Sequence, residues 1–198
     1  MSDAGFTNCL LDRTFVWFEA GNTNYGDVFA FRNCTMRGGR FSINRQSSTE
    51  GHIQTTILDS AFDNTTVSTS DPHASNASLT RYDYNAYLTN ASRTYPTGNH
   101  DVLVTNFNWQ RGWLGDFYLP PGSSLINTGS VTDAASVGLY HFTTVTNQVK
   151  ETNSTVDIGY HYVALDTTNV PVDTDTGGVA VYLEDATGSG TVELFSFT

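Results

Sequence analysis

The chain has 198 residues, a formal net charge of −11, and Lys150 as its single lysine. This acidic balance argues against nucleic acid and anionic membranes as partners, because both are bound by clustered Lys and Arg. The chain is rich in Thr, Ser and Asn, and its aromatic share of 13% is high. Thr and aromatic residues favour strands, Asn favours turns, and the composition therefore predicts an all-β chain.

Two stretches near the N-terminus repeat at a constant offset, which equals the sequence separation between Phe6 and Phe31. Phe6-Thr-Asn-Cys9-Leu aligns with Phe31-Arg-Asn-Cys34-Thr, and residues 26–36 align with residues 51–61. Polar segments rich in Asn, Ser and Gly separate these units. A period in the twenties, with short alternating strands, is typical of one coil of a parallel β-helix. We therefore expect stacked coils from about residue 6, with equivalent side chains forming ladders.

Cys9 and Cys34 occupy equivalent positions in the first two expected coils. Strands in neighbouring coils lie about 4.8 Å apart, which is within the range of Cα separations that a disulfide tolerates. Two alternatives stay open, a Cys9–Cys34 disulfide and a stacked pair of buried free thiols.

Aromatic residues cluster at two places in the chain. Alternation puts Phe15 and Trp17 on the same face of a strand, and Trp109 and Trp113 lie in a dense aromatic block. These side chains belong either to the core or to an exposed platform that binds glycan or protein. Trp17 and Trp109 are the candidates for glycan binding.

No motif with a recognisable catalytic mechanism occurs, so no catalytic residue is assigned. Asp59, Asp63 and Asp83 could line one face of the β-helix, as the carboxylates of a carbohydrate-active enzyme or as solvated ladders and turn caps. His52 is expected to be a turn or surface histidine. His141 and His161 are expected to be structural rather than metal ligands, because no third ligand has suitable spacing.

Strand-like segments resume at residues 81–87 and 101–107, and residues 156–163 predict another strand. Residues 178–182 and 191–197 predict a terminal pair of strands. The segments 81–87, 115–130 and 156–162 resemble the last coils and the C-terminal cap of bacterial right-handed parallel β-helix proteins of the pectate-lyase-like architecture.

This resemblance implies a fold, a domain division and a location. The fold is a short right-handed parallel β-helix with a C-terminal cap and terminal β-strands. Residues 1–165 form the coils and the cap, and residues 166–198 form an acidic tail with the terminal strand pair. The location is extracellular or at the cell surface. The architecture hosts enzymes, adhesins and passive stalks, so it does not by itself imply catalysis.

Residues 173–192 resemble a calcium-binding acidic repeat. Asp173, Asp175 and Asp185 match its ligand positions, whereas other ligand positions carry residues without carboxylate or amide side chains. Calcium is therefore the one cofactor considered. Five sequons are candidates for glycosylation, at Asn33, Asn64, Asn76, Asn90 and Asn153.

The ends of the expected β-helix differ. Nothing within residues 1–5 is long enough to cap the first coil, and residues 1–45 sum to +1 whereas residues 151–198 sum to −8. The segment 191–197 has no obvious partner in the cap, so we expect it to act as an assembly strand through Thr191, Val192, Leu194, Phe195 and Phe197. Alternatively, the chain is the C-terminal piece of a longer stalk.

These features predict a non-enzymatic structural subunit of an extracellular filament, fibril or surface layer, assembled from copies of itself by head-to-tail strand complementation. The alternatives are a carbohydrate-active β-helix enzyme, similar to a polysaccharide lyase or glycosidase, and a glycan-binding surface adhesin. No run of about 20 apolar residues occurs, so no membrane insertion is expected.

Overall fold

The structure is a computed structural model that describes residues 3–20, 28–45, 54–70, 80–165, 181–184 and 193–196. Strands dominate these residues, and the helical content among them is a short 3-10 helix, η1 (Ala134–Val137). The prediction of an all-β chain is therefore confirmed. Within the described ranges, no helix is long and apolar enough to cross a membrane.

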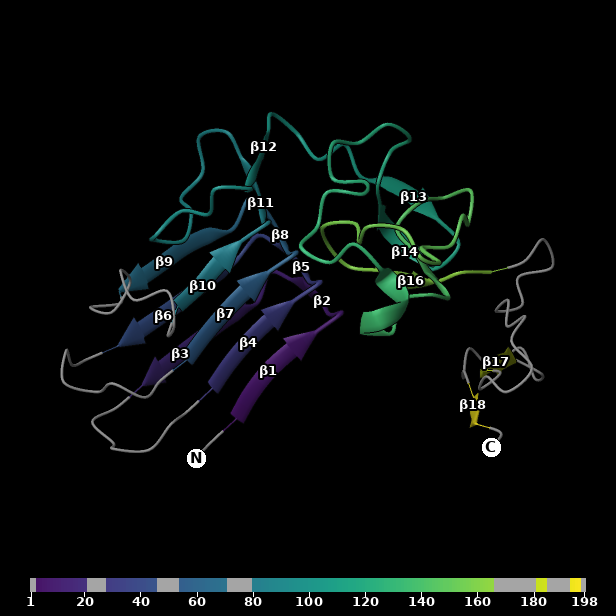
Figure 1. The fold of residues 1–198 in the computed structure, drawn as a ribbon, viewed down its shortest axis with the longest axis horizontal. Coiled ribbons are helices and arrows are strands. Elements are labelled where there is room, and N and C mark those ends of the chain that lie inside the picture. Colours follow the sequence, from purple (N-terminus) through teal and green to yellow (C-terminus); the bar gives the residue numbers. More distant parts are fainter. Residues whose placement is uncertain are drawn as a thin grey trace.

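Three parallel sheets form the N-terminal half of the chain (Figure 1). The first has the order β1 (Asp3–Thr7), β4 (Val28–Arg32), β7 (Gln54–Leu58), β10 (Thr80–Asp83). The second has the order β12 (Val102–Val104), β11 (Ala86–Leu88), β8 (Ala61–Asp63), β5 (Thr35–Arg37), β2 (Leu10–Asp12). The third has the order β3 (Phe15–Ala20), β6 (Arg40–Arg45), β9 (Thr66–Ser70).

From β1 to β11, consecutive strands enter the first, second and third sheets in turn, and β12 then pairs with β11 in the second sheet. We call each such set a rung: β1–β3 form the first rung, β4–β6 the second, β7–β9 the third, and β10–β11 the fourth. Each strand pairs in parallel with its counterparts in the neighbouring rungs, so equivalent residues lie side by side.

The offset between the first two rungs is the predicted one, since Phe6 pairs with Phe31. The predicted alignment of the second rung with the third is wrong by one residue, because Phe31 pairs with Ile57 and not with Thr56. Alternation explains the difference. The observed register turns Ile57 inward, where it is fully buried, whereas the predicted register would have turned it outward.

The main core lies between the three sheets and is built from inward-facing aromatic and aliphatic side chains. Phe31 of the first sheet packs against Phe62 of the second, with ring centroids 5.8 Å apart, and Tyr87 is the counterpart of Phe62 in the fourth rung. The rings of Phe62 and Tyr87 stack with centroids 5.2 Å apart and an interplanar angle of 6°. Each rung alone would leave these faces exposed, so stacking of rungs supplies most of the apolar burial.

One row of left-handed residues connects the first sheet to the second. Asn8, Asn33, Asp59 and Tyr84 stand at equivalent positions of the four rungs, with φ between 50° and 56°. Asn and Asp tolerate this conformation better than most residues do. This steric preference explains why Asn and Asp occur at this turn in three of the four rungs.

Residues 107–165, which we call the covering segment, include the stretches 115–130 and 156–162 that resemble a C-terminal cap. The covering segment packs on the outer face of the second sheet, where Ala61 and Ala86 meet Phe107, Leu125 and Ile158 in a second apolar cluster. In Figure 1 this part of the chain, coloured green, lies beside the arrowheads of β4 and β7. The outer face of the second sheet is apolar, and this segment shields it from water.

This covering segment contains two short antiparallel pairs. They are β13 (Gln110–Gly112) with β14 (Gly115–Tyr118), and β15 (Phe142–Thr143) with β16 (Tyr162–Val163). The rings of Tyr118 and Tyr162 stack at 4.1 Å between the two pairs. A further antiparallel pair, β17 (Val181–Glu184) with β18 (Glu193–Ser196), agrees with the predicted terminal strands. The predicted domain boundary at 165/166 lies next to residues outside the described ranges and stays a prediction.

Candidate functional site

Among the described residues, no strand pairs with the outer side of the first rung, and we call this side the open end. β1, β2 and β3 are the outermost strands of their three sheets on the same side of the stack. Their inward side chains Phe6, Leu11 and Phe18 are only partly buried against the core. The equivalent residues of the second rung, Phe31, Met36 and Ile43, have exposed fractions of 0%, 0% and 1%. One more layer of protein over the first rung would therefore be needed to complete its burial.

A row of side chains at the start of the second sheet runs through all four rungs. The backbone N–H of Cys9 donates to Cys34 Sγ (3.4 Å), Cys34 N–H donates to Ser60 Oγ (3.2 Å), and Ser60 N–H donates to Asn85 Oδ1 (3.1 Å). Asp101 ends the row by accepting from the N–H of Asn85 (3.0 Å) and of Gly98 (2.9 Å). Asp101 therefore supplies the last acceptor at the far end of the row, and Cys9 is the first residue of the row, at the open end.

Residues 89–101 cover part of the opposite end of the stack. Ser92 Oγ accepts from the N–H of Val67 in β9 (2.8 Å), and Tyr95 exchanges two hydrogen bonds with Thr69 of the same strand (2.7 and 3.2 Å). Next to β10, His100 N–H donates to Asp83 Oδ1 (2.7 Å). Residues 89–101 thus cover part of β9 in the third sheet and contact the end of β10 in the first, and β12 is the outermost strand of the second.

Phe15 and Trp17 form an exposed aromatic pair on the outer face of β3. Their exposed fractions are 55% and 58%, and their ring centroids lie 5.7 Å apart. The interpretation of these residues as core is therefore wrong, and their predicted placement on one face is confirmed. Trp113 is exposed as well (65%), whereas Trp109 is partly buried against Phe107.

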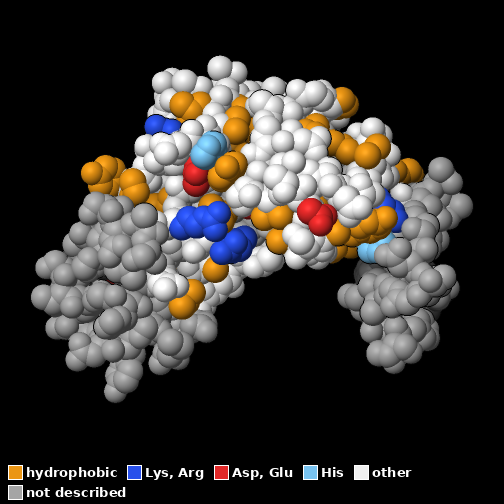
Figure 2. Space-filling model, viewed as in Figure 1, with side chains coloured by type: hydrophobic (Ala, Val, Ile, Leu, Met, Phe, Trp, Pro, Cys, Tyr) orange, Lys and Arg blue, Asp and Glu red, His pale blue; other side chains and the backbone are white. Residues whose placement is uncertain are grey.

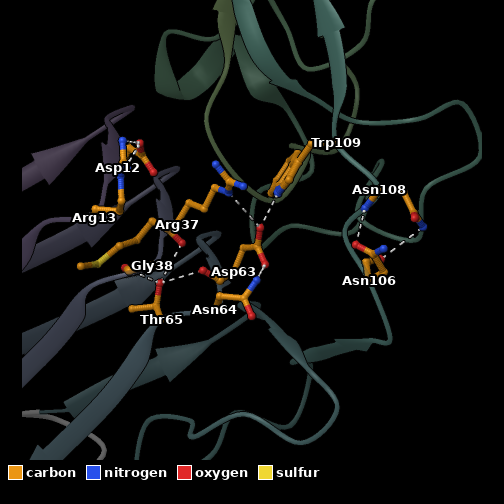
Figure 3. Close-up of polar contacts among 11 residues, drawn as sticks. Asp12, Arg13, Arg37, Gly38, Asp63, Asn64, Thr65, Asn106, Asn108 and Trp109 are labelled. Atoms are coloured by element: carbon orange, nitrogen blue, oxygen red, sulfur yellow. Dashed lines mark hydrogen bonds and ion pairs between the residues drawn. The ribbon is translucent and has the colours of Figure 1, made fainter.

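Trp109 is fixed by a polar contact that the sequence did not suggest. Its Nε1 donates to Asp63 Oδ2 (2.9 Å), and Arg37 Nε lies 3.8 Å from the same oxygen (Figure 3). The guanidinium of Arg37 also lies over the ring of Phe117, 5.6 Å from its centroid. These contacts hold the covering segment to the second sheet. Trp109 is therefore not a free platform for glycan.

The three candidate carboxylates have separate partners. Asp63 binds Trp109, Asp59 accepts from Ser130 N–H (2.5 Å) and Ser130 Oγ (2.6 Å), and Asp83 pairs with His100 Nδ1 (2.8 Å). Burial raises the pKa of Asp59. Burial also opposes ionisation of Asp83, but the hydrogen bonds from His100 and Tyr84 outweigh it and lower the pKa of Asp83. No shared site for general acid–base work joins these three groups.

A buried polar cluster in the covering segment was missed by the sequence reasoning. Glu151, Asp157 and His161 have exposed fractions of 4%, 6% and 0%, and His161 Nε2 lies 3.1 Å from Glu151 Oε1. Burial and the neighbouring Glu151 charge raise the pKa of Asp157 to about 6. Burial also opposes ionisation of Glu151, but its contact with His161 outweighs this and lowers its pKa. The signal available in the sequence was Asp157 and His161 within the strand-like run 156–163.

The partners of Asp157 indicate a positioning role in the fold. It accepts from Asn127 N–H (2.7 Å) and from Thr144 Oγ1, and the charge of the nearby Glu151 contributes to its raised pKa. A hollow of about 250 Å³ borders both carboxyls and Lys150.

The two histidines considered together in the sequence have different side-chain partners. His141 Nδ1 contacts Lys150 Nζ (3.3 Å), whereas His161 contacts Glu151. Within the described ranges, no group of three or more His, Cys, Asp or Glu is arranged to hold a metal ion. His52 and the candidate calcium ligands Asp173, Asp175 and Asp185 lie outside the described residues.

The sequons differ in accessibility. Asn64, Asn90 and Asn153 are exposed, Asn33 is buried, and Asn76 lies outside the described residues. Both Cys9 and Cys34 are free thiols.

The proposed assembly strand is not an orphan, because β18 pairs with β17 over Glu193–Ser196. Thr191, Val192 and Phe197 lie outside the described residues, and the strand itself contains Leu194 and Phe195.

Comparison with known proteins gives no significant match to a family model, a curated protein or a solved structure.

Proposed function

We propose that this chain is a non-enzymatic structural subunit that associates with copies of itself through the open end formed by β1, β2 and β3. One observation carries the proposal. Phe6, Leu11 and Phe18 are only partly buried, whereas their counterparts in the second rung are buried completely. An apolar end with unpaired strand edges is prone to pair with another chain.

The same proposal includes a right-handed parallel β-helix as the fold of the described strands β1 to β12. From β1 to β11 the chain enters three parallel sheets in rotation, with Phe6 paired to Phe31 and Phe31 paired to Ile57, which supports it. Parallel crossover connections are right-handed in nearly all proteins, which supports the handedness. An extracellular location is part of the proposal and is supported by the Thr-, Ser- and Asn-rich composition and by three exposed sequons.

The geometry favours a head-to-head contact over the head-to-tail contact expected from the sequence. A head-to-tail contact needs a second open end, but residues 89–101 hydrogen-bond to β9 of the third sheet and contact Asp83 at the end of β10. The last strand, which was the alternative donor, already pairs with β17. Two open ends facing each other would bury both first rungs and give a closed, two-fold dimer rather than a filament.

Sedimentation velocity and electron microscopy of the purified chain test this proposal. Leu11→Lys adds an inward-pointing charge at the open end and should give monomers, because charges at sheet edges prevent pairing. Leu103→Lys, at a 46% exposed leucine of β12, should leave the dimer intact. Leu114→Lys, at a 38% exposed leucine away from both ends, is the matched control. Circular dichroism checks that each variant folds.

The outcomes separate the arrangements. Dissociation by Leu11→Lys alone supports the head-to-head dimer. Filaments lost in both Leu11→Lys and Leu103→Lys would indicate the head-to-tail arrangement instead. A wild-type chain that stays monomeric at all concentrations would refute self-association.

Glycan binding is a second candidate, favoured by the exposed Phe15–Trp17 pair. The outward face of the third sheet continues from these rings to Arg40 and Ser42 in β6 and to Thr66 and Ser68 in β9. Sugars bind by stacking on aromatic rings and by hydrogen bonds to such polar groups. On the face drawn in Figure 2, charged side chains form small groups among hydrophobic and uncharged surface.

Tryptophan fluorescence in the presence of oligosaccharides tests this second candidate. Quenching should be lost in Trp17→Ala and kept in Trp113→Ala, which removes the more exposed tryptophan. Equal quenching in both variants would dismiss the Phe15–Trp17 pair as the site. A carbohydrate-active enzyme has weaker support, since Asp59, Asp63 and Asp83 do not form a pair.

A further inference from the structure

The thiols of Cys9 and Cys34 stack on neighbouring rungs in the same orientation. Cys34 Sγ accepts the N–H of Cys9 at 3.4 Å. Each thiol also donates to the carbonyl two residues earlier, Cys9 to Thr7 (3.3 Å) and Cys34 to Arg32 (3.0 Å). The two sulfur atoms therefore point the same way from equivalent positions of adjacent rungs.

The backbone around these residues is held in register. Thr7 pairs with Arg32 just before the cysteines, and Leu10 pairs with Thr35 just after them. Neighbouring strands lie about 4.8 Å apart, and disulfides span Cα separations of about 4.4–6.8 Å. A bond between the two sulfur atoms needs side-chain rotation and no shift of the rungs.

The two thiols differ in access. Cys9 is partly exposed at the open end, whereas Cys34 is fully buried. Burial raises the pKa of the Cys34 thiol to about 12. An oxidant in solution therefore reaches Cys9 first, and Cys34 reacts only with a sulfur atom already held beside it.

We propose that Cys9 and Cys34 form a redox latch, in which a small-molecule disulfide such as glutathione disulfide oxidises them to a disulfide that ties the first rung to the second. The thiolate of Cys9 attacks the glutathione disulfide, forms a mixed disulfide and releases one glutathione thiolate. The thiolate of Cys34 then attacks Cys9 Sγ and releases the second glutathione. The two protons of the protein thiols end on the two glutathione molecules, and the two protein sulfur atoms are oxidised as the glutathione disulfide is reduced.

The latch acts where the stack is least supported. β1–β3 have a neighbouring rung on one side only, so their detachment exposes less apolar surface than the opening of an inner rung. A disulfide that closes the loop from Cys9 to Cys34 limits that detachment and reduces the conformational entropy of the unfolded chain. This inference concerns the single chain, in which Cys9 is accessible at the open end.

The test is incubation of the full chain in glutathione buffers of increasing oxidation, followed by intact mass under non-reducing conditions, thiol counting and thermal unfolding. We expect a loss of two hydrogens, no free thiol, and a Tm higher by roughly 5–10 °C, all reversed by dithiothreitol. Cys34→Ser should stop at a glutathione adduct on Cys9 and gain no Tm.

Two results would overturn the proposal. One is a wild-type chain that stops at the Cys9 adduct, or keeps both thiols, under the most oxidising buffer. The other is a covalent dimer through Cys9 as the main product, which would assign this thiol to a contact between chains. Both are measured on the unmodified sequence, so neither depends on the stability of a variant.

Discussion

Asn8 and His161, far apart in the sequence, exchange two hydrogen bonds as neighbouring strands do. Asn8 Nδ2 donates to the carbonyl of His161 (2.9 Å), and His161 N–H donates to Asn8 Oδ1 (2.8 Å). Tyr160 N–H donates in the same way to Thr35 Oγ1 (2.9 Å), and Gly159 N–H donates to the carbonyl of Asp59 (2.9 Å). The run 159–161 therefore crosses the first three rungs and fixes the covering segment to them.

Replacement of Asn8 tests how much this attachment contributes. Asn8→Gly keeps the left-handed backbone (φ 50°) but removes both side-chain hydrogen bonds. It should lower the free energy of unfolding by about 1–3 kcal/mol, because the backbone N–H and carbonyl of His161 lose their partners. Urea unfolding measures it. Asn33→Gly is the matched control, since Asn33 has the same φ (51°) and its Nδ2 makes no hydrogen bond. Equal losses in both variants would contradict the prediction.

Ser60 is the third residue in the row of side chains that runs from Cys9 to Asp101. The hydrogen bonds of the row predict which residues can replace it. Ser60→Ala leaves the buried N–H of Cys34 without its acceptor and should cost about 1–3 kcal/mol of unfolding free energy. Ser60→Cys should cost less, because a sulfur atom already fills this role at Cys34, one rung earlier. Thermal unfolding of the reduced proteins ranks the variants. A Ser60→Cys variant that is less stable than Ser60→Ala would show that volume, and not hydrogen bonding, governs this position.

The raised pKa of Asp157 predicts a pH dependence of stability. A carboxyl whose pKa rises on folding, here to about 6, stabilises the native state while it stays protonated. That contribution is complete below the unfolded pKa near 4 and is lost as the pH rises through 6. Asp157→Asn keeps a neutral group at every pH and should unfold with less loss of stability between pH 5 and pH 8. Its advantage at pH 8 is of the order of 3 kcal/mol at most.

Urea unfolding at pH 5 and pH 8 measures this difference. Glu151 acts in the opposite sense, since its lowered pKa stabilises the native state at pH values above the unfolded pKa. Asp116→Asn, at a carboxylate whose side chain is 68% exposed, is the control and should leave the pH dependence unchanged. A wild-type slope in Asp157→Asn would contradict the assignment.

Two glycines with positive φ predict different costs for the same substitution. At Gly39 (φ 72°) a Cβ atom would lie 2.1 Å from the carbonyl oxygen of Thr14, whereas at Gly122 (φ 79°) no atom lies within 4 Å of it. Gly122→Ala should cost about 1 kcal/mol from backbone strain alone. Gly39→Ala adds a collision with the first rung and should cost several times more or prevent folding. Similar melting temperatures would contradict the close packing of these rungs.

The sequence by itself determined the class of structure and the repeat. Alternating Thr and aromatic residues, Asn turns and the repeat of Phe6-Thr-Asn-Cys9 at Phe31 predicted the strands of the first two rungs and the pairing of Phe6 with Phe31. These features are local, because alternation follows from the strand backbone and Asn favours the left-handed turn. The offset failed at the third rung, where one extra residue between β6 and β7 shifts Ile57 into the core.

Only the tertiary structure decided which faces are covered and which polar groups meet. Alternation put Phe15 and Trp17 on one face but could not tell whether another segment covers it, and none of the described residues buries them. Asp63 and Trp109, like Asn8 and His161, have no pattern that joins them in the sequence. Their contacts arise because the covering segment packs against the second sheet, and that choice depends on the apolar area buried by the whole assembly of strands.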